Sequence, residues 1–494
     1  MWLSGALLLM IPASAQAANK ITITGLTPAY SSKQSDFTVN CSRPVKVSIT
    51  AARSTPVSLD GKKFRSGSIR STVALKEGQR FSMVTKQGRH KTSQSVRCLP
   101  NDFPLWTTAG KASSQLGWMI LAPNLFLDLS PSVMRPVEKS RYVTVVNSAG
   151  VPVWWQKDAV AAPWDATLLP SGKLAWSRYN FDRATGPLGS YRIYGWNGKQ
   201  QGIITSPAQR PDSHEILATK DGGYLTLSSE PRNCPEQPDQ CADLSPWGGP
   251  ASATIMDSVI EKTDAKGKLS WSWSTKDHLS VADGARWIGL PSVQEELADG
   301  RTGWDIFHIN SLQEDSTGIV FTARQTDAVY RIDKTSGEII WKIGGTQHDY
   351  SLTVTGSKSA GIPLAGPHDA QLLKDGTISV YDNGTAARSP RVVRFRVTGK
   401  NATMIEQITD PKVTFSACCG SARRLAGGDW LVANGGSSTI KELTAAGKAL
   451  LTLTIPKGSF SYRAKAIDLK KILSMPRLVF CMSKASSYIS IPVN

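Results

Sequence analysis

The stretch of sequence that decides the fold runs from Trp304 to Gly345 and reads WDIFHINSLQEDSTGIVFTARQTDAVYRIDKTSGEIIWKIGG. It contains a histidine, a strand pattern that ends in an arginine, a second strand pattern, a tight turn at residues 333–337 and a third strand pattern that closes on Trp341. Short runs of this kind, separated by turns that carry Asp, Ser and Gly, predict a small antiparallel sheet. Each part recurs elsewhere in the chain, which indicates that the stretch is one unit of a repeat.

The clearest repeat is a glycine turn followed by a strand rich in Val, Ile, Leu or Trp. Six copies are visible, and they read NSAGVPVWW, GWNGKQQGII, TDAKGKLSWSW, DKTSGEIIW, RVTGKNATMI and LTAAGKALLTL. Their turn glycines are Gly150, Gly198, Gly267, Gly337, Gly399 and Gly447, separated by 48, 69, 70, 62 and 48 residues. A period of about 45 to 50 residues with several short strands per unit is typical of a β-propeller, and longer intervals predict inserted loops. The sequence therefore predicts an all-β chain with a six-bladed β-propeller; a sandwich array or a seventh, degenerate blade are the alternatives.

The repeat lies between segments of different character. Residues 1–17 form an apolar run ending in a small-x-small pattern, which predicts a secretory signal peptide. Because no Lys or Arg precedes the run, a membrane anchor is the alternative, and no later stretch is long and apolar enough to predict stable membrane insertion after cleavage. Residues 18–103 alternate β-type runs with turns and predict an N-terminal β-sandwich domain, followed by the propeller at residues 104–464. Residues 465–494 show none of the repeat, so a closing strand and a frayed end are both compatible with this tail.

The cysteines and the net charge indicate in which compartment the protein works and which class of partner it binds. The signal predicts a secreted, periplasmic or cell-surface protein, where disulfides persist. The seven cysteines are Cys41, Cys98, Cys234, Cys241, Cys418, Cys419 and Cys481. Pairing is expected between Cys41 and Cys98 and between Cys234 and Cys241, with at least one thiol left over. The net charge of +18 favours anionic partners, whereas the lack of a basic run interleaved with aromatic residues argues against nucleic acid.

A second repeat, a Leu-x-x-x-Gly hairpin, places three of the six histidines at one position. His214 lies nine residues before its hairpin glycine, His308 ten before and His368 eight before. The same position in two other repeats is Trp164 and Cys419. Equivalent positions in a propeller lie on a ring around the axis, so the three side chains are expected to converge, although any one of them alone would be read as a core histidine.

Counting forward from the same glycines reaches two arginines. Arg324 and Arg178 each lie six residues after their hairpin glycine. Arg324 is expected to reach the histidines, while a functional role and a salt bridge to a neighbouring blade are equally open for Arg178. Glu215 and Asp369 follow His214 and His368 directly, and strand alternation turns them to the opposite face. Inserted loops at about residues 230–252, 276–304 and 346–366 are expected to build the binding site.

Two chemistries suit three imidazoles and an arginine. Neutral imidazoles can bind a transition metal. Alternatively, one imidazole is a nucleophile while cationic groups stabilise an anion in transfer. Arg324 argues against a metal because its charge repels a cation, so neither a metal nor another cofactor is predicted.

At these positions the sequence resembles the arylsulfate sulfotransferases, exported six-bladed propellers with an N-terminal β-sandwich domain. The resemblance is carried by FHINS around His308, ARQTDAVYRIDKTSGEIIWKIGG with Arg324, PHDAQLL around His368, YDNG at residues 381–384 and, more distantly, DSHEIL around His214. It is closest to a branch that carries CCGSARRL, here residues 418–425. The two adjacent cysteines could form a vicinal disulfide or present a thiol to the substrate.

The resemblance implies transfer of a sulfuryl group from a phenolic sulfate ester to a phenolic acceptor without PAPS. His368 would be the nucleophile and carry a transient sulfohistidine in a ping-pong cycle. His308 and Arg324 would hold the sulfate and phenolic oxygens, and His214 would assist as a donor or acid/base. Further substrate-binding candidates are Asn310, Arg178 and Cys419. The alternatives are a metal-dependent propeller enzyme that uses the same histidines and a non-catalytic propeller that binds an anionic ligand; the oligomeric state is not predicted.

Overall fold

The computed structural model describes residues 19–130, 133–136, 141–179, 189–208, 210–356 and 362–468. The predicted signal peptide, Cys481 and the predicted tail from residue 469 onward lie outside the described residues. The chain divides into two compact units, one ending at Asn101 and the other beginning at Asp102. Nearly all of its regular structure is β-strand, which confirms the all-β class.

The N-terminal unit consists of two sheets that share one core. One sheet has the order β1 (Lys20–Ile23), β3 (Val45–Ala51), β5 (Gly67–Val73), and the other β2 (Asp36–Asn40), β7 (His90–Leu99), β6 (Arg80–Gln87), β4 (Val57–Leu59). Residues alternate along β3 between buried and exposed, so Val45, Val47 and Ile49 face the second sheet and pack with residues such as Phe37 and Phe81. A disulfide joins Cys41 to Cys98 in this unit.

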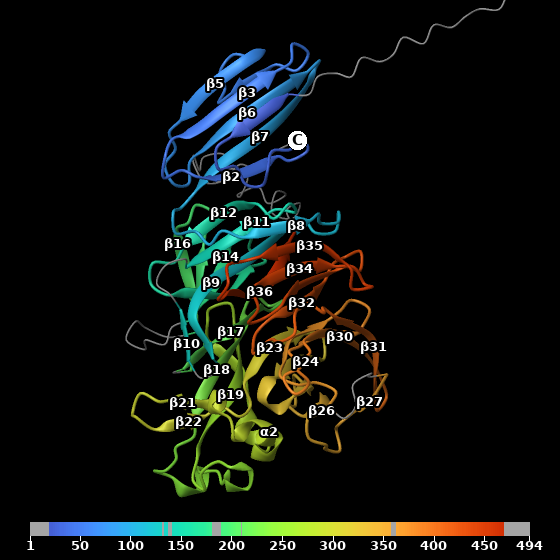
Figure 1. Ribbon diagram of the computed structural model, residues 1–494. Helices are drawn as coiled ribbons and strands as arrows, with labels where there is room; N and C mark the ends of the chain where they lie inside the picture. Colours follow the sequence, from blue (N-terminus) through green and yellow to red (C-terminus); the bar gives the residue numbers. More distant parts are fainter. Residues whose placement is uncertain are drawn as a thin grey trace, which may run out of the picture. The chain divides into compact units, whose positions relative to one another are not determined.

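The described residues of the second unit form six sheets, which follow one another along the chain (Figure 1). The first contains β9 (Trp118–Ser130), β10 (Val133–Pro136), β11 (Tyr142–Val146), β12 (Pro152–Lys157) and β36 (Ser459–Ile467). The second contains β13 (Ala162–Leu168), β14 (Leu174–Tyr179), β15 (Tyr191–Tyr194) and β16 (Gln200–Ile204). The third contains β17 (Pro211–Ala218), β18 (Tyr224–Pro231), β19 (Thr254–Thr263), β20 (Leu269–Ser274), β21 (Gln294–Glu296) and β22 (Thr302–Trp304).

Each of the remaining three sheets contains four consecutive antiparallel strands, and the fifth and sixth sheets each have one further strand. The fourth contains β23 (Ile309–Glu314), β24 (Gly318–Ala323), β25 (Ala328–Asp333) and β26 (Ile339–Gly344). The fifth contains β27 (Thr353–Thr355), β28 (Pro367–Leu372), β29 (Ile378–Asp382), β30 (Arg391–Thr398) and β31 (Asn401–Thr409). The sixth contains β32 (Ser421–Arg424), β33 (Trp430–Ala433), β34 (Thr439–Leu443), β35 (Ala449–Thr454) and β8 (Thr107–Gly110).

The first strands of these sheets form a closed ring. Along the chain β13 contacts β17, β17 contacts β23, β23 contacts β28 and β28 contacts β32, while β36 contacts both β32 and β13. β36 is antiparallel to β9, so the end of the described chain completes the first sheet, as Figure 1 shows. This arrangement is that of a β-propeller and supports six blades, although the blade count itself stays a prediction. β36 extends to Ile467 and therefore overlaps the start of the predicted tail.

The core of this unit is divided between neighbouring sheets, because each sheet buries both faces. Along β24, Ile319 and Phe321 pack toward the third sheet, whereas Val320 packs toward the fifth. Along β25, Tyr330 and Val329 divide in the same way. Period-2 alternation thus supplies two apolar faces from one strand, which explains why these segments read as continuous hydrophobic runs.

The inserted segments contain more regular structure than the predicted loops. The first carries η2 (Pro238–Gln240), η3 (Ser245–Trp247) and the disulfide Cys234–Cys241. The second carries α1 (Thr275–His278), η4 (Val281–Gly284), α2 (Ala285–Ile288), η5 (Pro291–Val293) and the hairpin β21–β22. β22 and β27 lie parallel to β19 and β31, so backbone pairing with existing sheet edges orders segments that the sequence predicts only as loops. A short η6 (Arg324–Thr326) joins β24 to β25. No helix among the described residues is long and apolar enough to cross a membrane.

Candidate active site

The first strands are distorted where the repeat places its ring residues. The register with the second strand shifts between Pro163 and Ala166, Pro211 and Ile216, Ile309 and Ser311, and His368 and Gln371. A β-bulge of this kind turns side chains away from the directions that regular alternation would give them. His308, Asp369 and Cys419 also have left-handed backbones, with φ values of 55°, 53° and 65°. Strain of this kind is expected where a fold positions functional groups.

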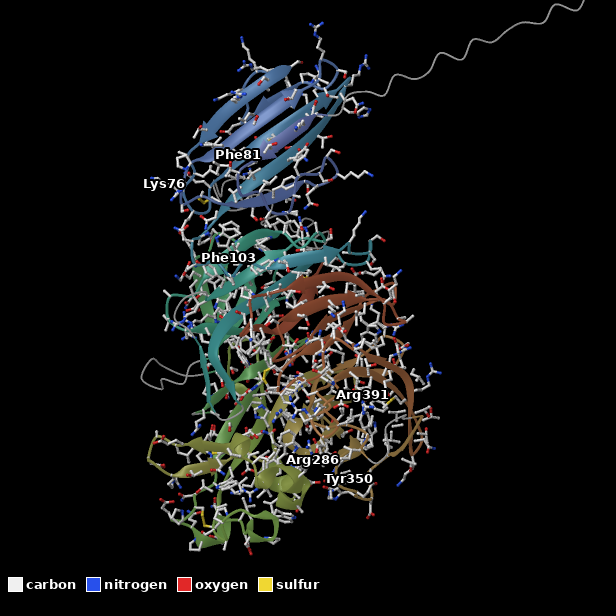
Figure 2. All side chains as sticks on the ribbon, in the orientation of Figure 1. Lys76, Phe81, Phe103, Arg286, Tyr350 and Arg391 are labelled. Carbon is white, nitrogen blue, oxygen red and sulfur yellow. A yellow bond between two sulfur atoms is a disulfide. The ribbon has the colours of Figure 1, made fainter. Side chains whose placement is uncertain are left out.

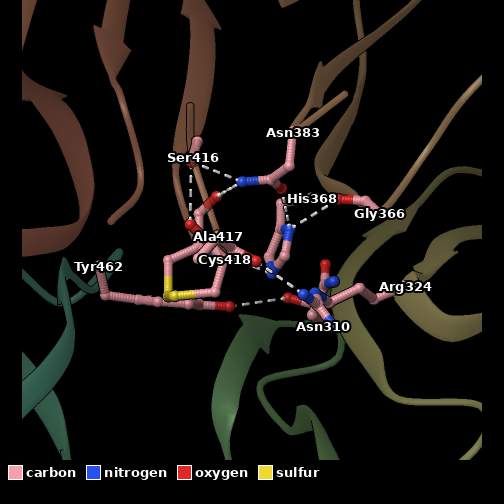
Figure 3. The surroundings of a disulfide bond; sticks show 10 residues. Asn310, Arg324, Gly366, His368, Asn383, Ser416, Ala417, Cys418 and Tyr462 are labelled. Atoms are coloured by element: carbon pink, nitrogen blue, oxygen red, sulfur yellow. Dashed lines mark hydrogen bonds between the residues drawn. A yellow bond between two sulfur atoms is a disulfide. The ribbon is translucent and has the colours of Figure 1, made fainter. Parts of the chain in front are cut away.

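His368, in β28, makes hydrogen bonds that define its tautomer (Figure 3). Its Nδ1 lies 2.6 Å from Asn383 Oδ1 and 3.2 Å from Gly366 O, and the backbone N–H of Cys419 donates to its Nε2 across 3.1 Å. Carbonyl oxygens only accept and a backbone N–H only donates. The imidazole therefore carries its proton on Nδ1 and a lone pair on Nε2.

Asn383 fixes this arrangement from the other side. Its Nδ2 donates to Ser416 Oγ at 2.7 Å and to Cys419 O at 3.1 Å, so its Oδ1 must face His368. Asn383 is fully buried. The amide thus links the orientation of the histidine to the segment that contains Cys419.

Burial is the main cause that holds the pKa of His368 well below its usual value, since the side chain is only 1% exposed. The positive charge of Arg324, together with His308 and His214, lowers the pKa further. A neutral imidazole can act as a nucleophile near neutral pH through its Nε2 lone pair, once that lone pair is released from the Cys419 N–H.

His214 and His308 differ from His368 in both partner and exposure. His214 Nδ1 lies 2.7 Å from Asp212 Oδ1, and His308 Nδ1 bonds Asp305 Oδ2. Their rings meet edge to face with centroids 4.6 Å apart, and the side chains are 13% and 22% exposed. Burial alone would raise the pKa of Asp212, but His214 and His308 hold it below its usual value, so this carboxylate stays charged. Each carboxylate fixes the orientation of one imidazole ring through Nδ1, and the Nε2 atom of that ring is left to contact another group.

Arg324 is a buried cation with donors to spare. Its Nη2 donates to Ala417 O at 2.7 Å, and its guanidinium lies 4.3 Å from the centre of the Trp287 ring. Burial lowers the pKa of Arg324 to about 10, so it remains charged at neutral pH. Its Nε is buried and has no hydrogen-bond partner within the described residues, and Asp327 nearby pairs with Arg286 instead. Such a guanidinium is suited to bind the oxygens of an anion.

Aromatic rings and a disulfide pack together beside these groups. The members of this aromatic group are Trp164, Tyr179, Phe460, Tyr462 and the disulfide-bonded Cys418 and Cys419. The Trp164 ring stacks on Tyr179 and on Tyr462, with centroids 4.3 and 4.8 Å away, and Tyr462 meets His214 edge to face at 5.5 Å. The vicinal cysteines therefore form a disulfide, the first of the two predicted alternatives. An apolar stack next to polar groups is a common setting for a ligand that has an aromatic ring.

Comparison with known families decides the relationship. The model of the arylsulfotransferases (ASST) matches residues 192–455, more than half of the chain. The chain belongs to the arylsulfotransferase family. The matched segment contains His214, His308, Arg324 and His368, and it supports an aryl sulfotransferase activity in general terms.

Solved structures resemble this arylsulfotransferase only distantly. A protein of unknown function from Bacteroides caccae has a TM-score of 0.41 and 11% identity over 71% of this chain and 98% of its own. A streptogramin B lyase has 0.37 and 10% over 72% and 89%, and the virginiamycin B lyase from Staphylococcus aureus has 0.33 and 11% over 89% and 100%. At such scores these structures carry no argument about function. No curated protein matches the chain.

Glu215 and Asp369 belong to a second cluster in the arylsulfotransferase, separate in its contacts from the histidines. We call it the ion-paired cluster; it consists of Asp165, Glu215, Asp369, Arg423, Arg463 and Lys465. Arg463 lies 2.8 Å from Glu215, 3.5 Å from Asp165 and 3.3 Å from Asp369. Burial alone would lower the pKa of Arg463, but these carboxylates and Tyr462 raise it well above its usual value. The cluster therefore neutralises itself, as buried charges must.

The other predicted substrate-binding residues have partners within the protein. Asn310 is fully buried; its amide donates to Pro367 O at 3.0 Å and accepts from Thr322. Arg178 pairs with Asp158 at 2.7 Å, between the first and second sheets. Of the two roles left open by the sequence, this contact corresponds to the salt bridge to a neighbouring blade. Within the described residues, no group of three or more His, Cys, Asp or Glu side chains is arranged to hold a metal ion.

Sequence reasoning missed the partners of the histidines in the arylsulfotransferase. A local signal existed for two of them, because Asp212 and Asp305 lie two and three residues before His214 and His308. Asn383, fifteen residues after His368, lies in the YDNG motif, but the motif gave it no role, and no local signal pointed to Trp287 in an inserted segment. The donor at Cys419 is a backbone N–H, which residue type does not reveal.

Proposed function

We propose that the protein is a PAPS-independent aryl sulfotransferase that works through a sulfohistidine on His368. The observation that carries the proposal is a neutral, Nδ1-protonated imidazole that feels the charge of a buried guanidinium, for which the described residues provide no carboxylate ion pair. Sulfuryl transfer needs both features. The nucleophile must offer a lone pair to the sulfur, and a cation must stabilise the anionic group that is transferred.

In the first half-reaction, the Nε2 lone pair of His368 attacks the sulfur of an aryl sulfate ester. The bond between sulfur and the phenolic oxygen breaks, and the phenolate leaves with the bonding electrons. His214 or His308 donates a proton to it from Nε2. The product is an N-sulfoimidazolium, with a proton on Nδ1 and a negatively charged sulfuryl group on Nε2, and Asn383 Oδ1 and Gly366 O accept hydrogen bonds from its Nδ1–H.

In the second half-reaction, an acceptor phenol transfers its proton to Nε2 of the same histidine, His214 or His308, that gave up a proton in the first. Its oxygen then attacks the sulfur, and His368 Nε2 leaves with the electron pair of the bond between nitrogen and sulfur. The enzyme returns to its starting state, with protons and electrons in balance over the cycle.

The Cys419 N–H and Arg324 stabilise the transferred group. The N–H covers Nε2 before the substrate arrives, and attack requires it to turn from the nitrogen to a sulfuryl oxygen. Arg324 is anchored to Ala417 O, two residues before Cys419, so both donors belong to one structural unit. The aromatic group supplies an apolar surface for the aryl ring, and Asn310 supports β28 through Pro367. The three disulfides fit an exported protein.

The test is rapid mixing of the purified protein with an aryl sulfate in the absence of acceptor. We expect a burst of one donor phenol per chain, and a proteolytic peptide containing His368 heavier by the mass of SO₃. The matched variant His368→Gln should give neither signal, and His90→Gln, on the N-terminal unit, should give both. Turnover without a burst or adduct would refute the sulfohistidine. Activity lost to a chelator would favour the metal-dependent alternative, and no release with any aryl sulfate would favour a non-catalytic propeller.

A further inference from the structure

The N-terminal unit carries most of the net charge of the protein. Residues 19–101 contain fifteen Lys and Arg residues and three Asp and Glu residues, a net charge of +12 out of +18 for the whole chain. One acid, Asp36, is bound to the buried Arg97. The active site does not explain this excess, because its cations belong to the second unit.

The excess is concentrated where two connections of one sheet lie side by side. The loop at residues 60–66 follows β4, and the turn at residues 87–90 joins β6 to β7. Arg65 forms a β-bridge with Val57, and Lys86 N donates to Pro56 O at 3.0 Å, so both connections reach the same end of β4. Long side chains ending in nitrogen project from this unit in Figure 2.

We call this region the basic tip and define it by Lys62, Lys63, Phe64, Arg65, Lys86, Arg89 and Lys91, all exposed. Lys86 and Lys91 lie directly opposite each other in the β6–β7 ladder, where like charges cost stability. No ion pair joins any of the six cations to a carboxylate in the part of the chain that the structure describes. The fold thus keeps repelling charges together without neutralising them.

Phe64 gives the basic tip a second property. Its ring is 38% exposed although the side chain is large and apolar, and Lys91 Nζ lies 5.8 Å from the ring centre. An aromatic ring flanked by cations in the sequence KKFR suits an interface between an apolar phase and anionic headgroups. A soluble polyanion would satisfy the charges but offer nothing to the ring, and single-stranded nucleic acid is bound by several stacked aromatic residues.

We propose that the basic tip docks the protein on anionic phospholipid bilayers. Lys and Arg side chains would contact headgroup phosphates, and Phe64 would enter the boundary with the acyl chains. The attachment is peripheral and reversible, and it weakens as salt screens the charges.

The test is cosedimentation of the whole chain, purified after export, with vesicles of phosphatidylcholine alone or mixed with phosphatidylglycerol. Comparing vesicles that differ in headgroup charge cancels any contribution from apolar segments elsewhere in the chain. The variant K62Q/K86Q/K91Q should bind the anionic vesicles on the order of a hundredfold more weakly. A matched control, K20Q/K46Q/R70Q, removes the same net charge from the other sheet of the unit and should retain most of the binding.

The outcomes divide clearly. Preferential binding to anionic vesicles with unequal losses in the two variants supports the proposal, as does a Phe64→Ser variant that dissociates at lower salt than the parent. Equal losses would show diffuse attraction and overturn the basic tip. Binding to a sulfated polysaccharide but not to anionic vesicles would also overturn it. Circular dichroism and sulfotransferase turnover check that each variant is folded.

Discussion

Two histidines of the site and two acids of the ion-paired cluster are adjacent residues of the same strands, β17 and β28, yet their charged neighbours are paired in different ways. His214 and His368 lie next to Glu215 and Asp369 along the chain, but the two acids contact Arg463, whereas the positive charge of Arg324 acts on His368. Arg463 is shared among three carboxylates, whereas the pairing partner nearest to Arg324 is taken by Arg286. Within the described residues, the ring thus holds one group of charges that is paired internally and, at Arg324, a buried Nε without a hydrogen-bond partner, which the proposed function assigns to the substrate.

The largest effect should come from the proposed nucleophile, His368. His368→Gln keeps the side-chain polarity but removes the lone pair, and we expect turnover of an aryl sulfate to fall at least about a thousandfold. His214→Gln should cost less, on the order of a hundredfold, because only proton transfer is lost. Release of the donor phenol, followed by absorbance, measures both. If His214→Gln were the more damaging of the two, the roles assigned to the imidazoles would be wrong.

Arg463→Met tests the ion-paired cluster and should lower the stability of the protein. It leaves Glu215 and its neighbours buried without their main cation, so we expect the free energy of unfolding to fall by about 3 to 5 kcal/mol. Urea unfolding followed by tryptophan fluorescence measures the loss. Arg394→Met, which removes a cation paired with Asp375 and Glu406 nearer the surface, is the control and should cost less. An unchanged urea midpoint would contradict the structural role of the cluster.

Arg324→Met should lower turnover but raise stability, whereas Arg463→Met should lower stability. We expect turnover to fall by about two orders of magnitude, as for the loss of one preorganised donor to a developing anion. Stability should rise by up to roughly 3 kcal/mol, because the folded state lowers the pKa of Arg324 from 12.5 to about 10 and so disfavours its charged form at every pH below that value. Parallel turnover and urea measurements test this. A variant that loses stability would mean that Arg324 is structural.

The smallest effect is the pH dependence of stability that His368 imposes. Its folded pKa lies below the ordinary value of 6.5, so between 6.5 and the folded pKa the unfolded chain binds a proton that the folded chain does not. Stability therefore falls as the pH falls through this window, by at most about 1.4 kcal/mol per pH unit. Unfolding free energies of the parent and His368→Gln at several pH values isolate this slope. If the unfolding free energies of the parent and of His368→Gln had the same pH dependence, the proton taken up on unfolding would belong to a group other than His368.

Repetition explains how much of this site the sequence could predict. His214, His308 and His368 were found because they share a repeat position, and Arg324 because it lies at a fixed distance from the same hairpin glycine. The bulges that aim them were not predictable, since a register shift depends on pairing with a second strand. Asn383 escaped for a related reason, because its role comes from a contact across the β28–β29 pair.

A closing strand was one of two alternatives for residues 465–494, but neither its start at Ser459 nor its partner β9 was predicted. β36 pairs with β9 across more than three hundred residues, and as a first strand it lacks the turn glycine that marks the other copies. Its Arg463 and Lys465 supply cations to carboxylates in three other sheets, so the sequence around them shows charge but no partner. Long-range pairing of this kind leaves no local periodicity to read.

The position of β36 also has a consequence for biosynthesis. A chain that emerges from its N-terminus presents β9 early, but the strand that pairs with it appears only after the five remaining first strands. Until β36 is synthesised, Asp165 and Glu215 lack the cations Arg463 and Lys465, so a partly synthesised chain leaves these two carboxylates without their ion pairs. Folding of this unit is therefore expected to finish only after β36 has been synthesised.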